Sequence, residues 1–257
     1  MTRPSWFNPG RMITLPTDKS RGFCTPGLPL YVPGADTTVA STQAFLNRVD
    51  GYVAAHMPHA DTHFAAEYPL SREAEIFPPH QIFGTPEWEY LLDFRQMTAP
   101  VGWVFKNVFD VGGSFGDSGV DPDKVTPLMT DVVERAFFDN LFQIGRGDPA
   151  EPASMEFGEH RDVFFEQLLL DGACVTLHMG DATDYCVRDA LKYALRWKQV
   201  EHAVLLTDLT HGIYNTDIPG GVDSLDALIR SDNLLWQAFV NGRLVLVKSD
   251  EFLRHAA

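Results

Sequence analysis

Short apolar runs rich in β-branched residues alternate with helix-like stretches along this 257-residue chain, and this alternation limits the folds open to it. The runs expected to form buried strands are residues 12–15, 51–55, 101–106, 174–179, 202–207 and 244–248. The pattern predicts a mostly parallel sheet wrapped by helices, a three-layer α/β/α sandwich in which ligands bind at the carboxyl ends of the strands. Functional residues are therefore expected directly after these runs.

No repeat, low-complexity tract or Pro/Gly-rich linker divides the chain, so we expect a single domain over residues 1–257. Residues 112–160 fit the alternation badly, because Gly-, Asp- and Pro-rich pieces surround a helical patch near residues 131–142. We interpret this segment as an insertion over the sheet. An insertion of this length serves as a lid, an interface or a decoration more often than as a second domain.

The composition excludes several classes of protein. Apolar residues make up 45% of the chain and charged residues 21%, which is enough for a buried core. A formal charge of −15 repels nucleic acid and anionic membranes, so neither is an expected partner. No apolar run approaches the roughly 18 residues that cross a bilayer, and residues 1–10 have no signal core. With only three cysteines, we expect a cytoplasmic protein without a disulfide framework.

A cysteine lies where a parallel sheet would place a nucleophile. Apolar positions after the strand at 174–179 repeat with helical spacing, and Thr183 or Asp184 can cap the start of that helix. Cys186 then lies in the first turn, where free N–H groups and the helix dipole favour a thiolate and can also hold an oxyanion. The alternative is that Cys186 is a small core residue, as most free cysteines are.

Two charged residues end other predicted strands. Asp18 follows the first strand and can accept the thiol proton, while Lys106 ends the strand at 101–106 and can keep Asp18 ionised. Taken singly, each charge is more often a solvated strand end. The hypothesis therefore requires that both side chains meet Cys186.

Histidines are dense between residues 56 and 80. His56, His59 and His63 surround Asp61, and His80 follows in a Pro-Pro-His segment. Imidazoles at this density indicate a divalent metal such as zinc, iron or manganese. A polar loop with solvated histidines is the alternative.

Residues 180–191 read Gly-Asp-Ala-Thr-Asp-Tyr-Cys-Val-Arg-Asp-Ala-Leu. They resemble the nucleophile motif of the nicotinamidase branch of the isochorismatase-like cysteine hydrolases, which reads much like Gly-x-Ala-Thr-Asp-Tyr-Cys-Val. As in that family, Asp18 stands five residues before a phenylalanine, Phe23. The resemblance covers most of the chain outside residues 112–160, and it implies an isochorismatase-like, Rossmann-like fold.

The resemblance implies roles for individual residues. It implies a catalytic triad of Asp18, Lys106 and Cys186, and an oxyanion hole formed by the N–H groups of Ala182 and Cys186. It also implies that the peptide bond between residues 181 and 182 is cis. Phe23 and Phe77 would provide aromatic walls for a flat substrate ring.

The same resemblance implies a metal, zinc first and iron or manganese as alternatives, held by an Asp-x-His pair, a further His and the His of a Trp-Pro-x-His segment. His59, His63 and His80 match the three histidines, and Phe77 stands where Trp is usual. Met57 stands where the Asp is expected and is a poor ligand. We therefore expect an altered site in which Asp61 or His56 replaces that Asp. A site that holds the metal only weakly, and histidines that bind the substrate directly, are the alternatives.

The implied function is an amidohydrolase that converts nicotinamide to nicotinate and ammonia through a cysteine thioester, in NAD metabolism. Two alternatives stay open: a related enzyme that acts on another small amide or ureido compound, and a catalytically silent relative that binds a small ligand or a protein partner. Vinyl-ether hydrolysis is less favoured, because it needs no cysteine nucleophile. The partner expected is a small-molecule amide, and homo-oligomerisation stays open.

Overall fold

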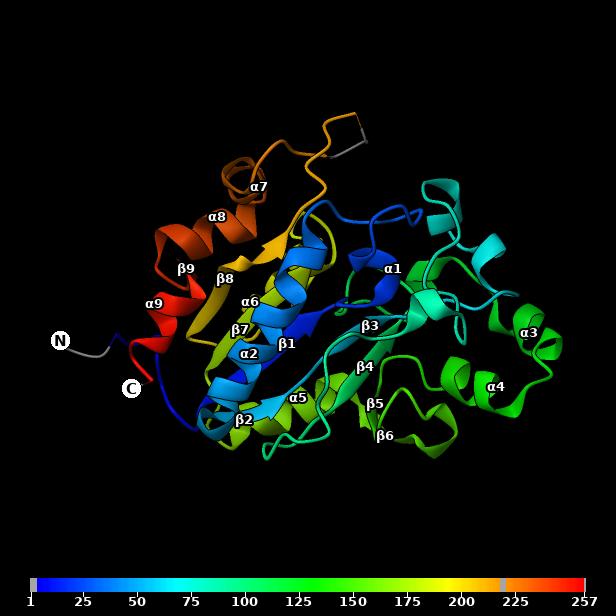
Figure 1. Cartoon of the computed structure of the whole chain (residues 1–257), viewed down its shortest axis with the longest axis horizontal. Helices are drawn as coiled ribbons and strands as arrows, with labels where there is room; N and C mark the ends of the chain where they lie inside the picture. Colours follow the sequence, from blue (N-terminus) through cyan, green and yellow to red (C-terminus); the bar gives the residue numbers. More distant parts are fainter. Residues whose placement is uncertain (1–3, 218–220, 257) are drawn as a thin grey trace.

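The computed structural model describes residues 4–217 and 221–256 and shows a central sheet with helices on both faces (Figure 1). The strands are β1 (Met12–Thr17), β2 (Val53–His56), β3 (His59–Asp61), β4 (Trp103–Lys106), β5 (Gln143–Arg146), β6 (Glu156–His160), β7 (Val175–Asp181), β8 (His202–His211) and β9 (Leu244–Val247). The helices are α1 (Arg21–Cys24), α2 (Val39–Val49), α3 (Pro122–Val125), α4 (Val132–Asp139), α5 (Arg161–Leu170), α6 (Cys186–Arg196), α7 (Leu225–Ser231), α8 (Asn233–Val240) and α9 (Ser249–Leu253). None of the helices in these residues is both long and apolar enough to cross a bilayer.

The strands form one sheet in the order β6-β5-β4-β3-β1-β7-β8-β9, and β2 also pairs with β1. Neighbouring strands are parallel throughout the part of the sheet that runs β4-β3-β1-β7-β8-β9, and β2 is parallel to β1. Strand β5 is antiparallel to both β4 and β6. The predicted mostly parallel α/β/α fold is confirmed, and every predicted run overlaps a strand. Parallel strands place their carboxyl ends at one edge, so residues that follow β1, β3, β4 and β7 lie close together there.

Strand β1 divides its side chains between two apolar cores. Met12 points to the face covered by α2 and α9, where Phe45 and Phe252 pack. Ile13 and Leu15 point to the opposite face, where α5 and α6 pack. The strand is buried on both faces, which explains why its apolar residues do not alternate with exposed polar ones.

Three strands were not predicted. Strand β3 is fully buried, yet two of its three residues are polar, so it has no apolar pattern to recognise. Strands β5 and β6 belong to the segment at 112–160. They extend the plane of the sheet beyond β4, so this part of the segment does not lie over the sheet as we expected. A short antiparallel hairpin carries the same sequence signals as an irregular loop.

The remainder of that segment is joined to the core through α4. The ring of Phe137 is completely buried, and its centroid lies 4.9 Å from that of Phe105 in β4 and 5.6 Å from that of Trp88. Val132, at the start of the same helix, is 80% exposed. One face of α4 is therefore part of the protein's interior.

Replacing Phe137 with alanine is expected to lower the free energy of unfolding by about 3–5 kcal/mol, because a large ring leaves a cavity in a packed core. The matched control, Val132→Ala on the exposed face of the same helix, is expected to change it by about 0.5 kcal/mol or less. Urea denaturation followed by circular dichroism measures both. Equal effects of the two substitutions would contradict the packing described for α4.

Candidate active site

Three residues that are far apart in the sequence meet at the carboxyl edge of the sheet. Asp18 follows β1, Lys106 ends β4 and Cys186 begins α6 directly after the loop from β7. The Lys106 Nζ atom lies 3.0 Å from Asp18 Oδ2 and 3.5 Å from Cys186 Sγ. Asp18 and Lys106 are completely buried, and Cys186 is 5% exposed. The structure thus brings together the three residues that the sequence proposed as a triad.

Backbone contacts hold Asp18 in this position. Its N–H donates to the carbonyl of His59, and its Oδ1 accepts from the N–H of Asp61, 2.8 Å away. Asp18 has a φ of 52°, which turns the chain out of the sheet directly after β1. Both ends of β3 therefore fix the carboxylate that faces Lys106.

Gly180 lets the ends of β1 and β7 lie close together. It pairs with Thr17 across the two strands, and its φ is +114°. A Cβ atom on this residue would stand 1.9 Å from the Thr17 carbonyl oxygen, so no other residue fits without moving the strands. The chain segments that carry Asp18 and Cys186 start from this close contact.

The charges of the three groups depend on one another. Burial raises the pKa of Asp18, and Lys106 opposes that rise. Burial would lower the pKa of Lys106, but Asp18, Cys186 and Asp61 together hold it well above its usual value. Burial also raises the pKa of the Cys186 thiol well above its usual value, and a hydrogen bond with Asp18 adds to the rise.

The raised pKa of Cys186 corrects the expectation of a thiolate. The start of α6 and Lys106 were expected to favour a thiolate, but the loss of water around Cys186 outweighs both in this closed state. The resting form is a thiol that needs a proton acceptor. Asp18 is placed to be that acceptor.

The loop between β7 and α6 has the expected cis peptide bond between Asp181 and Ala182. Its helix cap differs from the expectation, because Tyr185 precedes α6 and no side chain caps it. Thr183 hydrogen-bonds to Thr210 instead, at 2.8 Å, and the Asp184 carboxylate accepts the N–H groups of residues 213 and 214. Thr183 therefore ties the loop to β8, and Asp184 ties it to the chain that follows β8, rather than to the helix.

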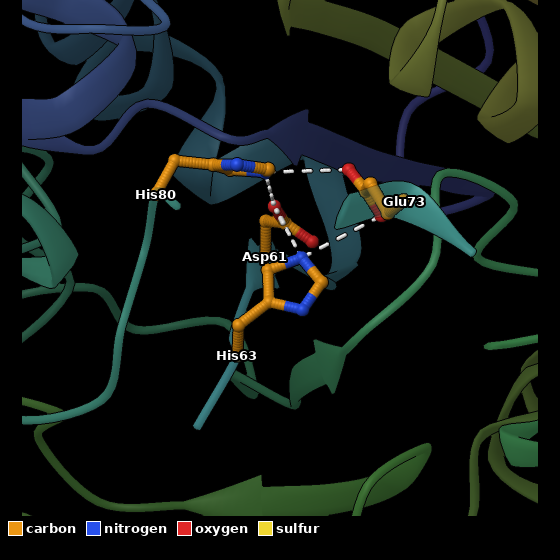
Figure 2. Close-up of side chains that lie close together, drawn as sticks. All are labelled: Asp61, His63, Glu73 and His80. Carbon is orange, nitrogen blue, oxygen red and sulfur yellow. Dashed lines mark ion pairs between the residues drawn. The ribbon is translucent and has the colours of Figure 1, made fainter. Parts of the chain in front are cut away.

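A second group of polar side chains is drawn in Figure 2, and through Asp61 it contacts Asp18 and Lys106. Four buried residues each direct one atom toward a common point, and these atoms all lie within 4.8 Å of one another: Asp61, His63, Glu73 and His80. The Nε2 atom of His80 stands 3.2 Å from both Asp61 Oδ2 and Glu73 Oε1. The Nε2 atom of His63 stands 3.5 Å from a carboxylate oxygen of each of the same two residues.

The donor atoms lie at ion-pair distances from one another, but none of these contacts counts as a hydrogen bond. Asp61 Oδ2, Glu73 Oε1 and the Nε2 atoms of His63 and His80 have no hydrogen-bond partner among the described residues, although all are buried. The other ring nitrogens are held from behind: His63 Nδ1 lies 3.4 Å from Glu67, and His80 Nδ1 lies 2.8 Å from a backbone carbonyl. Buried polar atoms rarely stay unsatisfied, and two imidazoles with two carboxylates are a donor set that suits a divalent metal.

The expected ligand set needs correction. His59 opens β3 within the sheet and does not belong to the group; its ring nitrogens have no hydrogen-bond partner among the described residues. His56 is turned away toward Thr14 and Asp50, at 2.7 and 3.0 Å. Met57 packs in the apolar core, so its failure to match the Asp has no consequence for the site.

The Asp-x-His pair was expected four residues too early in the chain. The expected Asp-x-His pair is present four residues later, as Asp61-Thr62-His63, where the chain leaves β3 at the carboxyl edge. Asp61 was considered only as a substitute ligand. Glu73 was missed, because an acidic residue in a loop normally faces water and only the tertiary structure shows that this one is buried.

The two predicted substrate-binding rings flank the site from different sides. The centroid of Phe23 lies 5.8 Å from that of His80, beside the four-residue group. The centroid of Phe77 lies 5.9 Å from that of Tyr185, the residue before Cys186, and 5.6 Å from that of Phe109. Phe23 therefore lies beside the four-residue group, and Phe77 lies beside the residue that precedes Cys186.

The site itself is closed, because Cys186 and its partners are almost completely buried. A cavity of about 960 Å³ lies elsewhere, lined mainly by residues 88–95 and 147–150, and it contains none of the residues around Cys186. Access to the thiol therefore requires side chains around it to move.

The fold resembles that of solved isochorismatase-like hydrolases, whereas no protein-family model and no curated protein matches the sequence. The resemblance predicted from the sequence is confirmed at the level of the fold. A pyrazinamidase of Pyrococcus horikoshii in complex with zinc is 18% identical, with a TM-score of 0.53 over 93% of this chain and 99% of that chain.

Two other structures are similar to the same degree. An isochorismatase-like hydrolase from Alkaliphilus metalliredigens is 14% identical, with a TM-score of 0.55 over 95% of this chain and 98% of that one. An N-carbamoylsarcosine amidase from Thermoplasma acidophilum is 13% identical, with a TM-score of 0.53 over 94% of this chain and 98% of that one. At such low identities the similarity establishes the fold.

Substitution of His80 by asparagine is expected to weaken zinc binding more than about 10-fold, since even outer partners of metal ligands are worth that much. The control, His59→Asn, removes a buried histidine outside the group and is expected to leave the affinity unchanged. Competition with a chromophoric chelator measures both. Equal losses in the two variants would show that the ligands have been misassigned.

Zinc binding is also expected to strengthen as the pH rises. Burial would lower the pKa of His80, but Asp61 and Glu73 outweigh it and raise the pKa to about 9, and the pKa of His63 is also raised. Both rings therefore carry protons near neutral pH and must lose them to bind metal, which weakens affinity about tenfold per displaced proton for each pH unit below the pKa. Titrations at about pH 6.5 and about pH 8.5 test this dependence, and equal affinities would contradict it.

Proposed function

We propose that this protein is a cysteine amidohydrolase that cleaves a small carboxamide, with nicotinamide, converted to nicotinate and ammonia, as the first candidate. The observation that carries the proposal is the position of Lys106 Nζ, 3.0 Å from Asp18 and 3.5 Å from the Cys186 sulfur. A thiol, a carboxylate and an ammonium brought together out of water are a costly arrangement, and such groups are typical of catalytic sites.

In the first half of the reaction, Asp18 accepts the thiol proton and the Cys186 sulfur attacks the carboxamide carbon. The carbonyl electron pair moves to oxygen, and the N–H groups of Ala182 and Cys186 stabilise the resulting oxyanion. Asp18 then gives its proton to the nitrogen, the C–N bond breaks and ammonia leaves. A thioester on Cys186 remains.

In the second half, Asp18 accepts a proton from water as the water oxygen attacks the thioester carbon. The C–S bond breaks, the carboxylic acid leaves and the sulfur takes back a proton from Asp18. Lys106 stays charged throughout and keeps Asp18 able to act as a base. This role fits the raised pKa of Lys106, which Asp18 and Cys186 maintain against burial.

The four-residue group would hold a divalent metal, with zinc as the first candidate because two imidazoles and two carboxylates suit it and the Pyrococcus structure contains it. When bound, such an ion supplies a Lewis acid that can hold a ring nitrogen of the substrate or polarise a water molecule. Asp61 belongs to this group and also contacts Lys106, so a metal held there would lie next to the proposed triad.

Nicotinamide is favoured as the substrate because Phe23 and Phe77 flank the site with aromatic rings that suit a flat heterocycle. A related amide or ureido compound is the second candidate. The observation that favours it is that the N-carbamoylsarcosine amidase and the pyrazinamidase are equally similar in fold, each with a TM-score of 0.53. Ammonia release from nicotinamide and from a panel of small amides and ureido acids distinguishes the two.

Cys186→Ala is expected to reduce ammonia release from nicotinamide at least about 1,000-fold, because removal of a nucleophile leaves only binding and oxyanion stabilisation. Cys174→Ala is the matched control, since Cys174 is also a buried free thiol but lies at the opposite end of β7. It is expected to retain the parent rate. An active Cys186→Ala protein would contradict the cysteine mechanism, whereas a parent inert toward every amide in which Cys186 resists alkylation would favour the silent ligand-binding relative.

A further inference from the structure

A second buried ion pair lies one residue along the chain from two groups of the proposed reaction. Lys19 follows Asp18, and Asp181 precedes Ala182. The Lys19 Nζ and Asp181 Oδ2 atoms are 2.6 Å apart, and neither side chain has any exposure. Neither residue contacts the Cys186 sulfur through an interaction seen in the described residues, so the pair acts on the site only through the backbone.

Both charges have several partners. The Lys19 ammonium also donates to Thr38 Oγ1 at 2.6 Å and to the carbonyl of Ala35 at 3.3 Å. The other oxygen of Asp181 accepts the N–H of His211 at 3.1 Å. The Cys24 thiol donates to Asp181 Oδ2 at 3.7 Å, and burial with the Asp181 charge raises the pKa of that thiol far above its usual value.

A pair in this environment is poorly explained by stability alone. Removing two charges from water costs about as much free energy as their attraction returns, and apolar residues of similar size are often equally stable. The pair provides a fixed orientation of the two chain segments, which apolar side chains would not. The Lys19 ammonium and the Asp181 carboxylate each bind their partners only within a narrow range of positions.

The pair lies where the sheet stops holding the two chain segments together. The ladder between β1 and β7 ends at Thr17 and Gly180, and the next residues on each side leave it. Lys19 and Asp181 join the same two segments just beyond the last paired residues. The N–H of His211, at the end of β8, also donates to Asp181. Three strand ends are thus tied at the point from which the Ala182 N–H and the Asp18 carboxylate project.

We infer that the Lys19–Asp181 ion pair is a positioning device that aims the Ala182 N–H at the oxyanion formed on the substrate. This inference rests on the proposed amide hydrolysis. The two buried lysines have separate tasks: Lys106 contacts the base and the sulfur, and Lys19 orients the loop that stabilises negative charge. Lys19 and Asp181 are therefore positioning residues and take no part in proton transfer.

The test uses the full chain with Lys19→Met/Asp181→Asn, in which both charges are removed so that none is left unpaired and Asn can still accept the His211 N–H. The kcat for amide hydrolysis is expected to fall about 100-fold, the loss seen when one oxyanion donor is removed, while KM changes less than about 3-fold. Lys192→Met/Asp232→Asn is the matched control. It removes a 3.0 Å ion pair that is distant from the loop and is expected to leave kcat unchanged.

Two readouts need no amide turnover. Pyridine-3-carbaldehyde forms a hemithioacetal: the Cys186 sulfur bonds to the aldehyde carbon, the carbonyl electron pair moves to oxygen and the thiol proton passes to Asp18. Its affinity depends on the oxyanion donors, so it is expected to fall in parallel with kcat. Alkylation of Cys186 by iodoacetamide, followed by peptide mass spectrometry, generates no oxyanion and is expected to stay within about 3-fold of the parent.

The outcomes separate the two proposals. A parent that hydrolyses no amide but binds the aldehyde contradicts the proposed function, and the loss of aldehyde affinity in the double variant still decides the inference. Unchanged kcat and aldehyde affinity overturn the inference, as does an alkylation rate that falls with kcat, because the pair would then act on Asp18 or on the fold in general. A parent that neither hydrolyses an amide nor binds the aldehyde overturns both proposals.

Discussion

Lys106 carries a positive charge in a place without water, and the surrounding site is arranged around that charge. Its Nζ atom contacts Asp18, Asp61 and Cys186 at 3.0, 3.4 and 3.5 Å. An unpaired ammonium would be too costly to bury, so the two carboxylates are required for the fold as well as for any chemistry. The four groups come from β4, β3, β1 and the segment after β7, which are consecutive neighbours in the sheet. Strand order therefore explains why these residues, and no others of their kind, meet.

Asp61 connects the two halves of the site. Its Oδ1 faces Lys106, and its Oδ2 faces the Nε2 atoms of His63 and His80. A metal bound by the four-residue group would attract the negative charge of the Asp61 carboxylate, which also stabilises the Lys106 ammonium. Occupancy of the metal site and the proton affinity of the triad are consequently linked through one side chain.

The sequence pattern predicted the structure correctly wherever the burial of a residue follows from its position in a helix or strand. Strands β1, β4, β7 and β8 are mostly buried and rich in apolar residues and were predicted, and Cys186 was placed in the first turn of α6 by helical spacing alone. Strand β3 and the hairpin of β5 and β6 were missed. Strand β3 is buried although two of its three residues are polar, and no periodicity in three residues can reveal this.

The sequence by itself determined which residues end the parallel strands, and with them the candidate triad, because the carboxyl ends of such strands must share one edge. Only the tertiary structure decided the ligand group, in which Asp61 and Glu73 belong and His59 does not. It also revealed the Lys19–Asp181 pair and the protonated state of Cys186. The physical reason is the same in each case: whether a charged or titratable side chain is buried, and which partner it meets there, depends on distances across the sheet that spacing along the chain does not contain.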